Sequence, residues 1–463
     1  MNTPAGSSHS TADRHEGPQA QPLRVAMTLV EMLVAMALTL LMMAAVAQIF
    51  GMLGQGVNGS RSMAELNDRM RATAYRLRQD LAGITVDTTP PVKPELNSGY
   101  LEIIEGPSSD RMYYDPNSGA AFDKSNGAVD AKGEWKGNPE PYLTNYGSDD
   151  RVVGDVDDII LFTSRSPGEP FSGKADSRNG GIEGGGFRSP YAEVVWFCRP
   201  AINAFNPRTY TLHRRQRLIA AHPGAEPFVN TRAAPNATAT NMFGGPPNTL
   251  PFTDWKTLYA MTDISCRRQG NLAVPNSLGD LTRRENRFLH LYDPTLPNSG
   301  FPHAFQKDSA DLTYDATSPR FGEDILLTNV IAFDIRVWDP LATIQTILTG
   351  TAAGDTKVAV APGDPGYVSG GGGVDRGAYV DLGNGLDAGS ILAGPCNALS
   401  KLNDASPPGP RTFCTWSTHY GQMGIPQAPP YSTSLEGIEI RIRCYEPSSR
   451  QVRQITIRHA FVQ

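Results

Sequence analysis

The sequence is poor in cysteine and has no close cysteine pair. Its five cysteines, among 463 residues, are Cys198, Cys266, Cys396, Cys414 and Cys444. Because no two of them form a Cys-x-x-Cys arrangement, the sequence predicts no zinc site. Outside the cytoplasm they would allow up to two disulfides with one thiol left over, and their spacing does not decide the pairing.

A long basic stretch and a catalytic signature are also missing. The chain has 41 basic and 47 acidic residues, a net charge of −6. Because nucleic-acid binding depends mainly on neutralising phosphates, this balance disfavours a nucleic-acid partner. No Gly-x-Ser-x-Gly or His-Glu-x-x-His constellation appears. We therefore expect no enzymatic activity, no cofactor and no bound metal, and an anchored enzyme is the least favoured alternative.

Only one long hydrophobic run is present, and it lies near the N-terminus. It covers the 25 residues from Leu29 to Leu53 and follows a polar stretch, residues 1–26. As a helix it would extend about 37 Å, whereas the ~30 Å core of a bilayer needs roughly 20 residues. The sequence therefore predicts one transmembrane helix over 27–53.

An acidic residue, Glu31, lies one turn inside this run. A carboxylate in a membrane helix costs about 2.5–3.5 kcal/mol unless it is near the interface or has a partner. The residues before it are, in order, Ala26, Met27, Thr28, Leu29 and Val30. This string resembles the cleavage and methylation signal of type IV prepilins and type II secretion pseudopilins, which is a Gly followed by Phe-Thr-Leu-Ile-Glu.

The resemblance implies how the N-terminus is processed. A prepilin peptidase would cut between Ala26 and Met27, remove residues 1–26 as a leader peptide, and methylate the new amino terminus. Glu31 would become the fifth mature residue and pair with the Met27 ammonium of a neighbouring subunit during filament assembly. Ala26 departs from the family, which prefers Gly there. The alternative is a plain signal anchor whose Glu31 reaches the lipid headgroups.

The helical pattern continues over 54–82, beyond a stretch that contains Gly51, Gly54, Gly56 and Gly59. Apolar residues then recur at helical spacing, at Met63, Leu66, Met70, Ala74, Leu77 and Leu81. This pattern predicts an amphipathic helix with one apolar face. In pilins the same long helix is half membrane anchor and half a spine packed on a β-sheet.

Residues 83–463 read as short strands separated by loops. Gly and Pro make up 83 of the 463 residues, an excess that favours many turns. Strands are predicted at Tyr100–Glu105, Arg111–Tyr114, Asp158–Thr163, Glu193–Cys198, Thr209–Leu212, Ile325–Trp338 and Gly377–Leu382, with a hairpin from Ile438 to Phe461. Loop insertions are expected at 115–156, 164–190, 222–252 and 350–376.

The hairpin alternates apolar residues with charged ones, so one of its faces is expected to be wet. The predicted fold is α+β: a long N-terminal helix packed on an antiparallel β-rich domain with long loop insertions. The order of the strands is similar to J-type pseudopilins and W-type minor pilins.

Four further patterns resemble functional motifs, but we interpret each of them as structural. Gly54–Gly59 fits a dinucleotide fingerprint but follows a membrane helix, and Gly168–Lys174 fits a phosphate loop but lacks the following Ser or Thr. The acidic cluster at 149–158 has no EF-hand spacing, so a solvated loop is expected there. His213–Arg217 is expected to be an exposed strand end.

The resemblance implies a minor pilin or pseudopilin that initiates or caps a type IV pilus or a type II secretion pseudopilus. Its partners would be prepilin peptidase, other pilins or pseudopilins, and an inner-membrane assembly platform. The 381 residues after Ala82 would have a radius of gyration of roughly 21 Å, too bulky for a repeated shaft subunit. The alternative is a pilin-anchored extracytoplasmic adhesin or binding module.

Overall fold

A computed structural model describes much of the chain. The described residues are 28–90, 92–105, 112–115, 120–123, 156, 158–175, 187–200, 209–220, 227–228, 249–253, 258–259, 262–283, 286–288, 322–348, 357–362, 372–382, 411–415, 434–449 and 451–461. By contacts the chain divides into two units, Met1–Arg61 and Ser62–Gln463.

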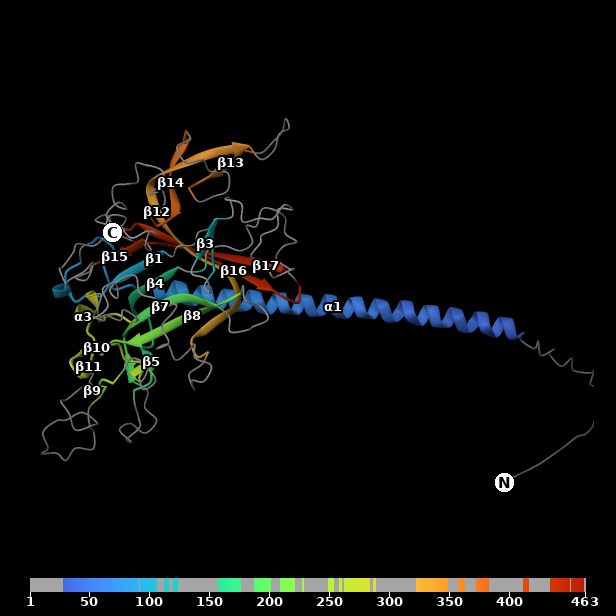
Figure 1. Ribbon diagram of the computed structural model, residues 1–463, viewed down its shortest axis with the longest axis horizontal. Coiled ribbons are helices and arrows are strands. Elements are labelled where there is room, and N and C mark those ends of the chain that lie inside the picture. The colour runs from blue at the N-terminus through green and yellow to red at the C-terminus, as the bar shows by residue number, and fades with distance from the viewer. Residues whose placement is uncertain are drawn as a thin grey trace, which may run out of the picture. The chain divides into compact units, whose positions relative to one another are not determined.

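The first element is one long helix, α1 (Leu29–Ala82), drawn in blue in Figure 1. It passes through all four glycines between 51 and 59 without a break, so Gly54–Gly59 has helical backbone and not the turn of a dinucleotide-binding loop. Its part in the first unit is apolar, and its part in the second unit is amphipathic.

The second unit is built mainly of strands. In spatial order, the main sheet contains β15 (Arg411–Cys414), β1 (Leu101–Glu105), β4 (Ile159–Arg165), β7 (Tyr191–Pro200), β8 (Tyr210–Leu218), β12 (Ile325–Leu348), β16 (Gly437–Glu446) and β17 (Gln451–Ala460). Two more strands pair with β12, namely β13 (Lys357–Val360) and β14 (Asp375–Asp381). All pairs in this ten-stranded sheet are antiparallel.

Smaller elements surround this sheet. They are the sheet β10 (Cys266–Gln269), β11 (Leu272–Pro275) and β9 (Leu250–Pro251), the pair β2 (Met112–Asp115) and β3 (Ala120–Asp123), the pair β5 (Phe171–Gly173) and β6 (Phe187–Ser189), the 3-10 turn η1 (Pro94–Leu96) and the short helix α3 (Leu278–Thr282). The described part is therefore mostly strand, with one long helix.

The apolar stripe predicted on the second half of α1 is confirmed. All six of its residues are buried, from Met63 at 8 % exposed to Leu77 at 0 %. Five of them, beginning at Leu66, belong to the same hydrophobic core as Trp196 of β7 and Ile440 of β16. The stripe thus faces the main sheet, as helical spacing requires.

All eight strand regions predicted from the sequence are found, with ends shifted by a few residues or with longer runs. The largest extension is β12, whose 24 residues pass Pro340 and pair successively with β8, β16, β14 and β13. Its register with β14 shifts between Asp339 and Thr343, around Pro340, which has no N–H to donate.

Some predicted loops contain strands. β3 falls within 115–156, β5 and β6 within 164–190, β9 within 222–252, and β13 within 350–376. These strands have two to four residues each, too few for an alternating pattern to show in the sequence. Much of 115–156 and 222–252 lies outside the described residues.

Candidate functional site

The described part of the N-terminal motif forms a reciprocal cap on α1. The Thr28 hydroxyl accepts a hydrogen bond from the Glu31 backbone N–H at 3.3 Å, and the Thr28 backbone N–H donates to Glu31 Oε2 at 2.9 Å. Thr28 Oγ1 also lies 3.1 Å from the same carboxylate oxygen as a donor. This is the capping-box arrangement, in which two orphan donors of the first turn are satisfied.

The cap gives Glu31 a partner inside its own chain. From the sequence, Glu31 is expected to pair with a neighbouring subunit. The Thr-x-x-Glu spacing in the sequence also predicts the local partner, Thr28. Leu29 and Val30 are exposed on the first turn, at 77 % and 66 %. Ala26 and Met27, the predicted cleavage site, lie outside the described residues.

Behind the cap, α1 presents an apolar surface on all sides. Residues Leu29–Met52 have a mean hydropathy of 2.3 over the best window, and none of that window is buried within the molecule. Thr39 satisfies its hydroxyl by donating to the Met36 carbonyl at 2.9 Å. By length and composition this segment can cross a membrane once, as an anchor or as a signal sequence.

At the other end of α1, one carboxylate joins the helix to the sheet. Asp80 is 2 % exposed and accepts two hydrogen bonds from Arg214 of β8, at 2.6 and 2.9 Å. The indole N–H of Trp196 on β7 donates to the same carboxylate at 3.1 Å. Arg76, one turn earlier on the helix, lies 3.5 Å away. The bidentate guanidinium fixes both the position and the orientation of this helix turn.

The His213–Arg217 run is not an exposed strand end. His213, Arg215 and Arg217 are each at most 3 % exposed, because β8 is a central strand with cover on both faces. Alternation divides the run between those faces. Arg214 points toward α1, whereas Arg215 bonds Asp324 and Arg217 bonds the Thr262 carbonyl.

The face of β8 opposite α1 is covered by segments between residues 249 and 288. The Arg217 guanidinium lies 4.0 Å from the centre of the Tyr259 ring, and Phe288 packs on Tyr259. Nearby, Glu193 accepts hydrogen bonds from Tyr100 Oη at 2.7 Å and Ser265 Oγ at 2.8 Å. Glu193, Tyr100 and Ser265 thus satisfy one another's buried polar atoms, which indicates a structural role for these three residues.

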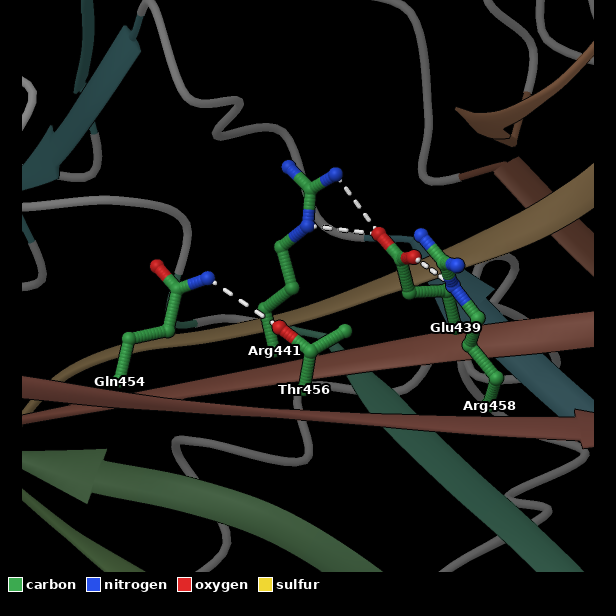
Figure 2. A pocket seen from close by; sticks show the side chains of 5 residues that line it. All are labelled: Glu439, Arg441, Gln454, Thr456 and Arg458. Atoms are coloured by element: carbon green, nitrogen blue, oxygen red, sulfur yellow. Dashed lines mark hydrogen bonds and ion pairs between the residues drawn. The ribbon is translucent and has the colours of Figure 1, made fainter.

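A charged hollow of about 460 Å³ lies on the hairpin of β16 and β17, lined by Glu439, Arg441, Gln454, Thr456 and Arg458. Figure 2 shows the two guanidinium groups converging on the Glu439 carboxylate. Arg441 and Arg458 donate to it at 2.7 and 2.6 Å. The hydrogen bond and charge of Glu439 raise the pKa of Arg458.

This face of the hairpin was expected to be wet, and that is wrong for Glu439, which is only 1 % exposed. The expectation overlooked Arg458, which is 19 residues away in sequence but directly opposite in the strand register. The apolar face is confirmed, since Ile438, Ile440 and Ile442 are each 0 % exposed.

Of the acidic cluster at 149–158, the structure describes only Asp158. It is fully buried, not solvated, and accepts a hydrogen bond from the Ile335 N–H at 2.7 Å. Within the described residues, no group of three or more His, Cys, Asp or Glu side chains could hold a metal ion. In the predicted phosphate-loop pattern, Gly168 lies in a bend and Phe171–Gly173 forms strand β5.

The four described cysteines are buried and free, so none is joined to another; they are Cys198, Cys266, Cys414 and Cys444. The fifth, Cys396, lies outside the described residues. The two disulfides that the sequence allowed are therefore not present among these four thiols.

Comparison of the chain with protein-family models, curated proteins and solved structures gave no match.

Proposed function

We propose that this chain is a minor pilin or pseudopilin, processed by prepilin peptidase, that helps to initiate or cap a type IV pilus or a type II secretion pseudopilus. The observation that carries the proposal is the string Thr28-Leu29-Val30-Glu31 at the first turn of a helix that is apolar on all sides up to Met52. An ordinary signal sequence has no use for a carboxylate at that position.

A second feature supports the same proposal. The helix does not end with its apolar part but continues to Ala82, where its buried stripe packs on an antiparallel sheet. A simple signal anchor needs no such continuation. In this proposal the chain is a single-pass protein of a bacterial inner membrane, with its sheet domain outside the cytoplasm. Its partners are prepilin peptidase, other pilins or pseudopilins, and the assembly platform.

Processing is tested by the intact mass of the chain from a peptidase-positive host. The proposal expects a mature chain that starts at methylated Met27. Ala26→Gly restores the residue that the family prefers and should be cut at least as completely, whereas Ala26→Leu should block the cut. A mature chain that starts elsewhere, or a cut indifferent to both substitutions, overturns the assignment.

The cap and the assembly role of Glu31 are compatible. An ionised carboxylate has about four acceptor positions, and Thr28 occupies two of them. The others remain chemically able to accept the Met27 ammonium of a neighbouring subunit. In lipid, pairing the Glu31 carboxylate with this ammonium offsets part of the desolvation cost of both charges, so the pair would favour assembly.

Glu31→Gln separates the two roles. Glutamine at this position can still complete the cap, but it has no charge. If the charge pairs between subunits, Glu31→Gln should be inserted and cleaved normally yet fail to co-purify with other pilins, and Glu31→Leu should fail in the same way. Thr28→Val removes the capping hydroxyl and keeps the charge, so it should assemble. Assembly of Glu31→Gln at the parental level would limit Glu31 to the cap.

The tip assignment is tested by copy number. Quantitative mass spectrometry of purified filaments should find this chain at a small fraction of the major subunit. Near-equal amounts would mean that the shaft accommodates its bulk, and the tip assignment would then fail.

A further inference from the structure

The outermost strand of the main sheet, β17, has one long edge available for pairing. It ends the spatial order of the sheet, and within the described part of the chain it pairs with β16 alone. Its ten residues form an edge as long as the central strand β7. Nine of the ten are partly or fully exposed, and only Ile457 is buried. Long edges of this kind are templates for another strand.

The ladder itself shows which backbone groups face outward. The Phe461 N–H donates to the Glu436 carbonyl at 2.8 Å, which sets the phase of the antiparallel ladder. Counting back from Phe461, every second residue of β17 is hydrogen-bonded to β16, and the residues between them direct N–H and C=O away from β16. On β17 they are Val452, Gln454, Thr456, Arg458 and Ala460. The free edge therefore offers five donors and five acceptors in a regular row.

The side chains of β17 define what an added strand must look like. Ile455 and Ile457 lie on the core face, the first half-buried and the second fully buried. Gln454, Thr456 and Arg458 lie on the opposite face, where they line the charged hollow (Figure 2). A strand that extends the sheet would continue the apolar layer beside the isoleucines and place polar side chains beside the hollow.

Charge selects the partner. The hairpin from Gly437 to Ala460 contains five arginines and two glutamates, whereas the whole chain has a net charge of −6. β17 itself has Arg453 and Arg458 and no acidic residue. The nearest carboxylate, Glu439, already accepts from Arg441 and Arg458. A second copy of this edge would bring arginines together, which disfavours self-pairing, while carboxylates would be attracted.

We propose that β17 is a docking edge for an extended, acidic strand of another protein, which adds to the sheet through backbone hydrogen bonds. The partner strand alternates apolar residues, placed beside Ile455 and Ile457, with carboxylates on the opposite face, placed near Arg458. This interaction goes beyond the proposed pilin function and does not depend on the N-terminal motif.

The test uses the full chain in detergent and a fluorescent peptide of alternating glutamate and valine, nine residues long, followed by anisotropy. The peptide should bind, and a lysine–valine peptide of the same length should not. A peptide with the same composition in two blocks, glutamates then valines, controls for charge alone. Equal binding of the block peptide would overturn the proposal, since attraction without strand pairing would explain it.

Two changes examine the backbone pairing directly. Thr456→Pro removes an outward N–H without touching the ladder to β16, and it should weaken binding about tenfold, whereas Thr456→Val should not. Methylating alternate backbone nitrogens of the peptide along one edge should abolish binding while the protein stays unchanged. Unaltered binding of that methylated peptide would refute strand addition even if the proline variant fails to fold.

The charge requirement is tested with Arg458→Glu, compared with Arg188→Glu on β6, which belongs to a separate two-stranded sheet with β5. The first should weaken binding of the acidic peptide about fivefold and the second should not. Equal effects of both substitutions would show that only the net charge of the chain matters, and the assignment of the edge would fail.

Discussion

Replacing Asp80 by asparagine tests whether α1 is fixed to the sheet by charge as well as by packing. Asp80 is 2 % exposed, and the side chain of its partner Arg214 is 9 % exposed, so water screens the pair little. Removing one member of a buried ion pair leaves the other charge uncompensated, at a cost of about 3–5 kcal/mol. Gln216 also accepts from Arg214 at 3.1 Å and keeps part of that charge solvated. We therefore expect a loss near the lower end, about 3 kcal/mol.

The assay is thermal unfolding of the full chain in detergent, followed by far-UV circular dichroism and by tryptophan fluorescence. At roughly 2 °C per kcal/mol for a large domain, Asp80→Asn should lower Tm by about 6 °C. Asp68→Asn is the matched control, since Asp68 lies on the same helix but is exposed. It should leave Tm within about 1 °C of the parent.

A double-mutant cycle identifies the partner. Arg214→Met keeps much of the apolar stem of the side chain and removes its charge. Once Arg214 is gone, Asp80→Asn should cost at least about 1 kcal/mol less than it does in the parent. Purely additive costs would show that the two side chains are not coupled. If the Asp80→Asn and Asp68→Asn chains had the same Tm, this would refute the argument that the Asp80 carboxylate fixes the helix.

Three further predictions concern the C-terminal hairpin. Ile440→Asp puts a carboxylate at a position that is 0 % exposed and should lower the free energy of unfolding by several kcal/mol. Ile440→Val should lower it by about 1 kcal/mol. Equal Tm values for the two variants would contradict the burial of this face. Burial raises the pKa of the Cys444 thiol to about 12, so iodoacetamide at neutral pH should label it only after unfolding, and rapid labelling of the native chain, seen by peptide mass, would contradict this. Burial lowers the pKa of His459 below its usual 6.5. The unfolded chain therefore binds a proton at His459 more readily, and stability is lost as pH falls through 6.5. His459→Gln should reduce the drop in Tm between about pH 7.5 and pH 5, and an unchanged drop would contradict this prediction.

Elements with several turns or strand repeats could be predicted from the sequence. Six apolar residues at helical spacing fix which side of α1 meets the sheet, and all six are buried, Met63 to Leu81. In the same way, Ile438, Ile440 and Ile442 show the core face of β16 through simple alternation. Both patterns are local and long, so no distant residue is needed to interpret them.

Burial of charged residues could not be predicted in this way, because it depends on partners far away in sequence. The run of basic residues on β8 suggested exposure, yet Arg214 meets Asp80 and Arg215 meets Asp324. Each pairing joins residues more than 100 positions apart. A charge that is buried with its partner looks the same in a sequence as one in water.

The two notable carboxylates of α1 show where such partners can nevertheless be anticipated. Glu31 lies in the first turn, where the helix dipole favours an acid and Thr28 can cap it, so its position needs no tertiary partner. Asp80 lies in the last turn, where the same dipole disfavours an acid by about 0.3–1 kcal/mol. It is also next to the apolar stripe, between Leu77 and Leu81, and so on the side that becomes buried. An acid that is unfavourable on both counts must be compensated from outside the helix, and the guanidinium of Arg214 supplies that compensation. Charges in electrostatically wrong positions on an amphipathic helix are therefore the ones for which a distant partner should be sought first.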